Sequence, residues 1–503
     1  MFQKQGGVFV SGSNSTSIHN EITEIKRAPI MISLIMGAFF AILNETLLNV
    51  AFTDLIVEFN VSAPTIQWLA TGFMLVVGIL VPITALLTGW FTTRQMFIGA
   101  MILFTIGTII CGFAPNFSFL LLGRLIQAGG TGLLMPVMMN TILLIYPPHK
   151  RGGAMGTIGL VIMFAPAIGP TLSGIILEAL NWRWLFFIVL PFAVFSIVFA
   201  SIYLKNVSEV TKPKVDFISV ILSTLGFGGI VFGFSSAGEG SGGWTHPEVY
   251  ISVIVGIVSL ILFVIRQLRL EEPMLDVRVF KYPMFALTAV LLIITMMTLF
   301  STIILLPMLL RGGLAFTAFM TGIALLPGGL INGLISPITG KLFDKFGPRK
   351  LVIPGTIILV VIMYLFSNVT KETSIITFIV LHTLLSIGIA MIMMPTQTNG
   401  LNELTRNHYS HGTAILNTLQ QVAAAIGVAF FISIMSTGQS RYLSGVDDPT
   451  SANEIANSMI SGVQMAFTVG LVFAIIGLIL SFFIKRTVAP DYVENEPVQK
   501  PLH

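Results

Sequence analysis

The sequence predicts an all-α protein that crosses a membrane fourteen times, and three observations lead to this fold class. Of its 503 residues, 55% are hydrophobic and only 10% are charged, whereas soluble domains carry roughly 25% charged residues. Apolar runs of about 20 residues recur from end to end, and each is long enough to cross ~30 Å of hydrocarbon as a helix. The short alternating strands of a membrane β-barrel do not occur.

The apolar runs give the positions of the helices in chain order. They cover approximately residues 29–51, 66–90, 96–114, 117–145, 153–178, 183–204, 216–236, 248–266, 283–306, 317–340, 350–368, 373–395, 412–434 and 460–484. Residues 1–28 are polar and lack the apolar core of a cleavable signal. We therefore expect disordered cytoplasmic tails at 1–28 and 487–503.

The Lys and Arg residues of the connections orient the helices, because cytoplasmic loops carry an excess of positive charge. With the N-terminus inside, the inner connections and tails hold 21 of the 26 Lys and Arg residues, and the outer connections hold four. The remaining one, Arg124, lies within the fourth span. This asymmetry predicts an even number of spans and two cytoplasmic termini, in a cell membrane of the bacterial type.

An internal repeat divides the chain. The fourth span contains LMPVMMN and the twelfth contains MMPTQTN, so that Pro136 with Asn140 matches Pro395 with Asn399. The tripeptide AIG follows in the next span of each copy. An offset of eight spans predicts two six-helix halves, 29–204 and 283–486, and two inserted helices within 205–282. Two parallel six-helix halves are the major facilitator architecture.

Several classes of function are excluded by what the sequence lacks. The positive residues are dispersed over loops, which argues against nucleic acid binding. No phosphate-binding loop of the G-x-x-x-x-G-K-[ST] kind occurs, so ATP is not the expected fuel. We find no catalytic His/Asp cluster and no metal-ligand spacing. The lone Cys111 lies in an apolar run as a packing residue. The protein is therefore not expected to be an enzyme or to need a cofactor or metal.

Three stretches of the chain read as motifs. GRLIQAGGTG at 123–132 places Arg124 and Gln127 in the fourth span, and NWRWLFFIVLP covers 181–191. GLVIMFAPAIGPTLSG in the fifth span contains Gly159, Pro166, Gly169, Pro170 and Gly174. The first resembles the basic motif and the third the antiporter signature of the fourteen-helix drug:proton antiporter branch of the major facilitator superfamily, the EmrB/QacA group, and within it the LmrB-like lincomycin-resistance exporters; the second is typical of this branch. The resemblance implies that this signature packs two helices together.

The resemblance also implies a cytoplasmic gate. The second gating motif is intact as GKLFDKFGPRK, with Gly340, Asp344, Gly347, Arg349 and Lys350. Its charges are expected to pair across the cytoplasmic face in one transport state and to separate in another. The alternative is a loop that is simply positive. The first copy of the motif, GWFTTRQ at 89–95, has lost its acidic residue, and Arg94 is its remnant.

The first span carries the sequence LNETLLNVA, where the family motif is usually Leu-Asp-x-Thr followed by Asn-Val-Ala. The usual Asp is Asn44 here, and the acid is one residue later, at Glu45. One residue turns a helix by about 100°. The proton site is therefore re-aimed, or Glu45 has another role.

Glu45 is the one acid well inside a predicted span, and an ionisable residue in a membrane is a functional candidate by default. At 1.5 Å per residue it lies roughly 9 Å from the outer end of its span, and Arg124 lies some 12 Å from the outer end of the fourth. The two residues are therefore at similar depth. We predict that Glu45 and Arg124 couple transport to protons, or else form a static pair that joins spans one and four.

Other polar side chains within the spans are candidates for contact with substrate. Asn417, Gln420 and Gln421 share one face of the thirteenth span, at helical spacing. The other candidates are Asn44, Asn49, Gln127, Asn140, Asn332, Gln397, Asn399 and His382. The alternative for the amides is hydrogen bonding between helices, and for His382 it is a neutral, hydrogen-bonded ring.

The resemblance implies a monomeric, proton-coupled multidrug exporter whose partners are small amphipathic drugs, protons and membrane lipids. Two alternatives stay open. The protein could export one specific metabolite or lipid, or it could be a membrane sensor without transport activity.

Overall fold

The computed structural model describes residues 27–145, 164–166, 168–204, 206, 216–237, 245–271 and 273–487, and every regular element within them is a helix. Thirteen of these helices are long and apolar enough to cross a membrane. A shorter apolar helix, Phe164–Ala179, lies where the fifth span is predicted. For the described residues, the prediction of an all-α membrane fold is confirmed, and the thirteen long helices together with this shorter one are consistent with fourteen spans.

The helices fall into three groups along the chain. The first group is α2 (Arg27–Leu47), the 3-10 segment η1 (Leu48–Ala51), α3 (Phe52–Phe59), α4 (Ala63–Trp90), α5 (Thr93–Gly112), α6 (Phe117–Ile145), the helix Phe164–Ala179, α8 (Trp184–Phe187) and α9 (Leu190–Tyr203). The second is α10 (Phe217–Ser236), α11 (Pro247–Arg269) and the 3-10 segment η3 (Val277–Lys281). The third is α12 (Pro283–Met308), the π-helical segment η4 (Leu309–Gly313), α13 (Ala318–Phe346), α14 (Arg349–Phe366), α15 (Ile375–Asn402), α16 (Arg406–Leu443) and α17 (Ala452–Ser481).

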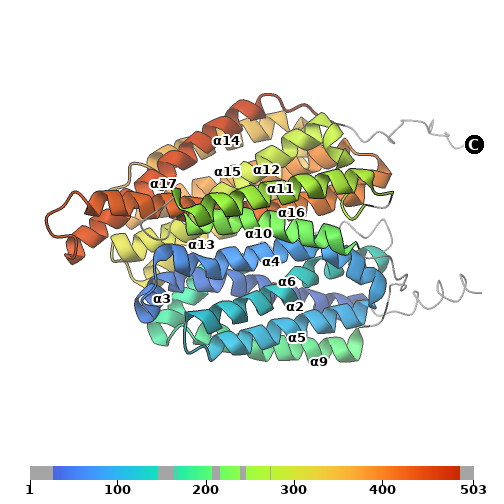
Figure 1. Cartoon of the computed structure of the whole chain (residues 1–503), viewed down its shortest axis with the longest axis horizontal. Helices are drawn as coiled ribbons and strands as arrows, with labels where there is room; N and C mark the ends of the chain where they lie inside the picture. Colours follow the sequence, from blue (N-terminus) through green and yellow to red (C-terminus); the bar gives the residue numbers. More distant parts are fainter. Residues whose placement is uncertain are drawn as a thin grey trace, which may run out of the picture.

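The groups lie side by side along one long axis (Figure 1). The first group fills the lower part of this view and the third group the upper part, and α4 packs along α16 where they meet. The start of α2 and the end of α17 lie at the same end of the bundle, which we call the terminal end. The loop between α16 and α17 projects from the other end, which we call the distal end.

Polar residues set where several helices begin. The side chains of Ser62, Thr92, Thr317 and Ser374 accept hydrogen bonds from backbone N–H groups in the first turns of α4, α5, α13 and α15, groups that have no partner within the helix. Most predicted spans agree with the helices to within a few residues. Helices α13, α15 and α16 run past their predicted ends, and α17 begins before its predicted start. Hydropathy marks the membrane crossing, whereas helical hydrogen bonding continues into polar residues.

The first span differs from its prediction in one important respect. It does not end near residue 51 but continues through α3 to Phe59, and η1 interrupts it at Leu48–Ala51. A stretch of 3-10 helix in the middle of a helix often marks a hinge. This interruption begins three residues after Glu45. The candidate proton site is therefore next to an irregularity of the backbone that hydropathy does not reveal.

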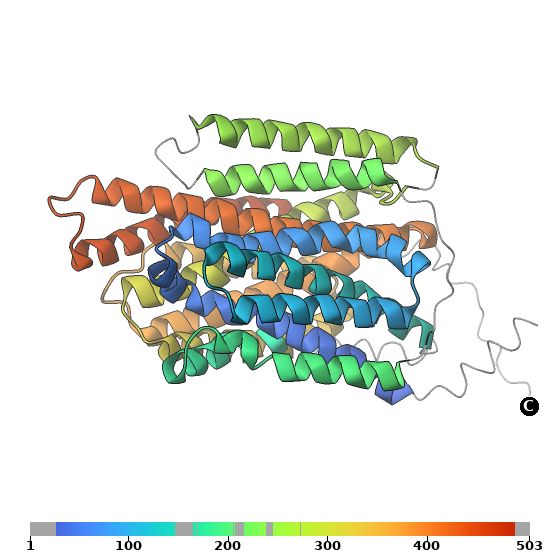
Figure 2. The same cartoon turned by 60° about the horizontal axis from the view of Figure 1, so that its bottom comes forward.

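The inserted pair α10 and α11 covers the place where α4 and α16 meet. Helix α10 contacts both, while α11 lies on its outer side (Figure 2). Gln67 of α4 donates a hydrogen bond to Ser235 of α10 at 2.7 Å. Along α11, Ile251, Ile254 and Ile261 are more than half exposed, as expected for a surface that faces lipid. The division of the chain into two halves with an insertion remains a prediction that these contacts support.

An ion pair fastens the inserted helices to each other at the terminal end. The Arg266 guanidinium binds Asp216 through two bonds of 2.8 Å. The hydrogen bonds from Arg266 hold the pKa of the Asp216 carboxyl at about 2, below its ordinary value of 3.8. Because the folded pKa is depressed, the stabilisation is fully present above about pH 4 and is lost as the pH falls through about 2.

We therefore expect Asp216→Asn to lower stability by about 1 kcal/mol at neutral pH, the upper end for an ion pair near the surface. The difference in melting temperature from wild type should shrink as the pH falls from 4 toward 2. Thermal unfolding of purified protein across this range measures it. Glu248→Gln, a change at an exposed acid on α11, is the control. A difference that does not depend on pH would contradict the assignment.

Candidate proton and substrate site

The first group of helices, called the N-terminal group from here on, holds at its centre a buried arginine whose hydrogen-bond partners are neutral. Arg124 of α6 is 1% exposed. Its guanidinium donates to the Leu69 carbonyl at 3.2 Å, to Asn44 Oδ1 at 3.1 Å and to Gln127 Oε1 at 2.7 Å. It also lies 4.2 Å from the centroid of the Phe73 ring. The cation is thus satisfied by dipoles and an aromatic face, and its charge is not neutralised by direct contact with an acid.

Asn44 and Gln127 connect this arginine to two further helices. The Asn44 amide donates to the Leu185 carbonyl of α8 at 3.3 Å, and the Gln127 amide donates to Thr108 Oγ1 of α5 at 2.7 Å. Both side chains are buried. Because their polar atoms are used between helices, the structure favours interhelical hydrogen bonding for Asn44 and Gln127 over contact with substrate.

Glu45 is not ion-paired with Arg124, although both residues are described and the guanidinium attracts the carboxylate electrostatically. The residue of α2 that accepts a hydrogen bond from the guanidinium is Asn44, one position before Glu45. The static ion pair considered from the sequence is therefore not formed in this structure. Among the described residues, no hydrogen bond or ion pair engages the Glu45 carboxylate. This acid is half-buried rather than fully enclosed, and a proton can be added to it or removed without breaking an ion pair.

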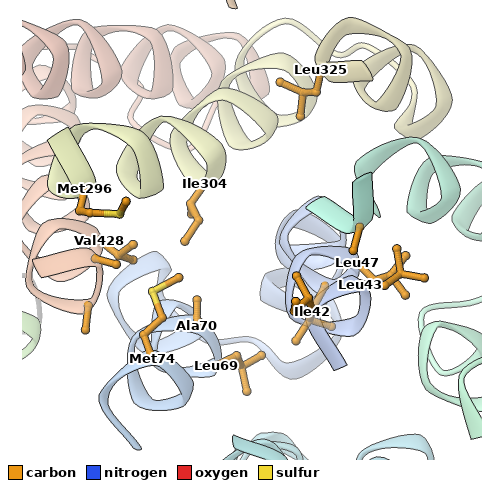
Figure 3. Close-up of a cluster of buried hydrophobic side chains, with 14 of the residues drawn as sticks. Ile42, Leu43, Leu47, Leu69, Ala70, Met74, Met296, Ile304, Leu325 and Val428 are labelled. Atoms are coloured by element: carbon orange, nitrogen blue, oxygen red, sulfur yellow. The ribbon is translucent and has the colours of Figure 1, made fainter. Parts of the chain in front are cut away.

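One helical turn from Glu45, an apolar group draws its side chains from both parts of the bundle. Ile42 lies three residues before Glu45, on the same side of α2. Figure 3 shows Ile42 across from Leu69, Ala70 and Met74 of α4, with Met296 and Ile304 of α12 beyond them. Val428 of α16 and Leu325 of α13 complete this group. Apolar side chains of α2, α4, α12, α13 and α16 thus meet in the middle of the bundle, and Ile42 of this group is one helical turn from Glu45.

The antiporter signature lies where the first and third groups of helices touch. A Cβ atom on Gly174 would be 2.5 Å from the Ala318 carbonyl oxygen of α13, and one on Gly169 would be 2.1 Å from Thr46 Oγ1 of α2. A Cβ atom on Gly322 of α13 would likewise be 2.6 Å from the Pro170 carbonyl oxygen. Pro166 precedes them, half-buried, while Gly159 lies outside the described residues. The signature therefore packs its helix against α2 and α13, as the resemblance implied.

We predict that Gly174→Ala impairs export at least fivefold, because its new methyl group would overlap a backbone carbonyl that cannot rotate away and overpacking costs roughly 1–3 kcal/mol. Initial rates of drug export in cells with matched expression measure the effect. Gly129→Ala in α6 is the control, since nothing lies within 4 Å of its added Cβ. Equal rates for the two variants would refute the close contact.

The remaining polar candidates divide by their contacts. The Asn399 amide donates to the Lys485 carbonyl at 2.9 Å and its Oδ1 accepts from the Thr487 N–H, so it holds the end of α17. The Asn332 amide donates to the Ser386 carbonyl at 3.2 Å. His382 packs against Gly328, and its Nδ1 has no hydrogen-bond partner among the described residues.

The other candidates stay predictions. Asn417, Gln420 and Gln421 are half-buried on α16, and the Gln421 Cβ faces Gly78 of α4. Gln397 is half-buried in α15, and Asn49 is buried in η1. The side chain of Asn140 lies outside the described residues. In the described part of the chain, no group of three His, Cys, Asp or Glu side chains is arranged to hold a metal ion.

The gate motif lies at the terminal end. Gly340 lies six residues before the end of α13, and Gly347 follows the helix with φ of +76°, a backbone conformation that favours glycine. The Asp344 carbonyl accepts from Arg486, whereas its carboxylate forms no ion pair with a described residue. Lys350 lies over the Phe346 ring beside Arg349, the first residue of α14. Arg94 donates to the Ser201 carbonyl of α9. The charges of the motif are therefore not paired across the bundle in this state.

Several residues that the structure brings together carry no recognisable signal in the sequence. Phe73 is one apolar residue among many until Arg124 packs on it. Asp54 and Arg311 stand 257 positions apart in outer connections, yet they form a bidentate ion pair. A match in charge between distant loops is too common to identify such a pair.

Comparison with known proteins agrees with this architecture. The family model described as the Major Facilitator Superfamily matches residues 34–428. The chain is 58% identical to the lincomycin resistance protein LmrB of Bacillus subtilis over 463 residues, which is 92% of this chain and 97% of the relative. It is 28% identical to a multidrug resistance protein B homolog of Mycobacterium tuberculosis, over 80% of this chain and 75% of the relative.

Among solved structures, a bacterial homolog of the human lysosomal transporter Spinster superposes with a TM-score of 0.67 and 14% identity. The match covers 91% of this chain and 96% of that one. At this identity the likeness concerns the fold. Together with the fourteen apolar helices and the family model, which matches most of the chain, it leads to one conclusion: this protein belongs to the major facilitator superfamily.

Proposed function

We propose that this protein is a proton-coupled multidrug efflux antiporter that exports amphipathic, cationic or lincosamide-type compounds by alternating access. The observation that carries the proposal is the presence of two ionisable side chains within the membrane helices, one held by hydrogen bonds and the other without a bound partner. Arg124 is held by neutral partners, and Glu45 of α2 has no ion pair with any residue that the structure describes. Ionisable residues at such depth are costly and mark ion pathways.

The two charges suit an exchange mechanism. With the site open to the cytoplasm, a substrate binds beside ionised Glu45. The two halves then rock so that the site opens outward, and a proton from outside binds the carboxylate and displaces the substrate. The protonated form returns and releases its proton inside. Throughout the cycle Arg124 keeps its partners. Exchange of one proton for a neutral substrate moves one net charge, to which the membrane potential contributes about 2.3 kcal/mol per 100 mV. Exchange for a monovalent cation moves no net charge and is driven by the pH gradient.

The surroundings of Glu45 support the class of substrate. The apolar group in Figure 3 fits the apolar part of an amphipathic compound, and two methionines, Met74 and Met296, provide flexible, polarisable surface. A carboxylate at the edge of this group attracts a cationic substituent. Relatives named for lincomycin resistance and for multidrug resistance favour compounds of this kind.

The proposal also covers the orientation of the protein in the membrane and its oligomeric state. The 21 to 4 distribution of positive residues supports a cytoplasmic terminal end and an external distal end. One chain carries both sets of helices around the apolar group, so a monomer is sufficient for transport.

Purified protein in liposomes tests the function. Lincomycin and the fluorescent cation ethidium are each followed under an imposed pH gradient, and the same measurement is repeated after a protonophore collapses it. We expect uphill movement of both compounds with the gradient and none after its collapse. Movement of neither compound would contradict multidrug antiport, and movement that survives the protonophore would contradict proton coupling.

A further inference from the structure

An ion pair at the distal end joins the two sets of membrane helices. Arg311, in the π-helical segment η4, binds Asp54 of α3 with both arms of its guanidinium, at 2.6 and 2.7 Å. It also donates to the Val50 carbonyl at 2.8 Å. The Arg311 side chain is only 16% exposed. Bidentate arginine–carboxylate pairs are strong and fix the geometry of both partners, so this contact holds α3 against the end of α12.

Helix α3 is attached to both sides of the molecule. Glu58, four residues after Asp54, accepts from the indole of Trp182 at 2.6 Å and from Arg183 at 3.1 Å. Both of these partners belong to the same N-terminal group of helices as α3. The short helix is therefore fixed to its own group through Glu58 and joined to the C-terminal group through Asp54.

The carbonyl that Arg311 binds belongs to the interruption of the first span. Val50 is part of η1, five residues after Glu45 and four before Asp54. Arg311 thus contacts the first span at its hinge and again one turn later. A movement of the first span at this hinge is transmitted directly to the arginine of the opposite group.

Two more hydrogen bonds between the groups lie at the same end. Thr171 Oγ1 donates to the Gly322 carbonyl at 2.9 Å, and the Phe319 N–H donates to Glu178 at 3.2 Å. These bonds join the helix Phe164–Ala179 to the start of α13. The groups are therefore closed against each other at the distal end. In any cycle that exposes the central site on this side, the contacts must break.

We propose that Asp54 and Arg311 form the outer latch of the transport cycle, which is intact in this distally closed state and broken when the site opens outward. This inference rests on the proposed alternating access. The latch differs from the other contacts at this end because it is ionic, is bidentate and binds the hinge of the span that carries Glu45. Its loss shifts the population toward the outward-open state.

The test uses a reporter thiol beneath the latch. Cys111 is the single native cysteine, so Cys111→Ala with Ala70→Cys places one thiol in the apolar group of Figure 3. A membrane-impermeant maleimide added from outside labels it only when the distal end opens. Arg311→Gln and Asp54→Asn should each speed labelling roughly three- to tenfold, more than expected for an exposed pair and less than for a fully buried one. The double variant should add little to either single change.

Arg183→Gln is the matched control, because it removes an arginine at the same end whose acid lies in its own group. It should leave the labelling rate within about twofold of the background protein, as expected for an exposed pair. Unchanged labelling in both latch variants, or an equal increase in Arg183→Gln, would overturn the proposal.

A second measurement does not depend on how the latch variants fold. Cysteines at 54 and 311, bridged by a short cleavable bifunctional thiol reagent, should stop export of lincomycin, and cleavage of the bridge should restore it. Normal export by the bridged protein would also overturn the latch. Labelling measures the opening of the distal end and does not require drug transport. If the latch variants speed labelling but the protein transports no drug, the proposed function is refuted and the latch is still supported.

Discussion

Replacement of Glu45 by Gln is expected to abolish uphill transport in proteoliposomes while substrate exchange across the membrane continues. Glutamine keeps the size and most of the polarity of the side chain but cannot release a proton. Net export requires that the site alternate between ionised and protonated forms, whereas exchange of one substrate molecule for another does not. Gradient-driven uptake of lincomycin should fall to the level of liposomes without protein, and counterflow should stay within about threefold of wild type, since Arg124 and its neutral partners are unchanged.

The control for this experiment is Glu58→Gln. Glu58 lies on the same span but near the distal surface, with a side chain that is 41% exposed. Its replacement should leave the pH dependence of transport as it is in wild type. Full gradient-driven transport by Glu45→Gln would exclude Glu45 as the coupling residue. The buried His382 of α15, whose Nδ1 lacks a described partner, would then be the next group to replace.

Replacement of Arg124 by Leu is expected to cause the largest loss of stability among single changes in the N-terminal group. Three acceptors, the Leu69 carbonyl, Asn44 Oδ1 and Gln127 Oε1, would lose their donor at once. A buried acceptor left without a partner costs roughly 1–3 kcal/mol, and the contact with Phe73 would be lost as well. We expect the free energy of unfolding in mixed detergent micelles to fall by about 3 kcal/mol or more.

Two companion variants show whether the geometry of the guanidinium matters. Arg124→Lys keeps the charge but lacks the planar fork that reaches separated acceptors, so it should recover less than half of the lost stability. Arg183→Leu removes an arginine whose side chain is 33% exposed and should cost at most about 1 kcal/mol. A stable, fully folded Arg124→Leu protein would mean that the network is not needed to hold α2, α4, α5 and α6 together.

The sequence by itself determined the fold class, the positions of the helices and the choice of Glu45. These properties follow from local composition, because a membrane crossing requires a long apolar run and an acid inside such a run is conspicuous. The repeat of Pro136 and Asn140 in Pro395 and Asn399 likewise needs no coordinates, since it compares the chain with itself. The antiporter signature was identified by resemblance, and its packing against α2 and α13 follows the expected role.

The partners of these residues were decided by the tertiary structure. The sequence places Arg124 at the depth of Glu45. Neighbouring residues of a helix point about 100° apart, and in the folded protein it is Asn44, not Glu45, that points at Arg124 and accepts its hydrogen bond. The hinge at Leu48–Ala51 interrupts a run that hydropathy reads as continuous. Asp54 and Arg311 meet across 257 residues because two helix ends converge at the distal surface. Depth and polarity are local properties of a sequence, whereas the direction in which a side chain points depends on how the helices pack.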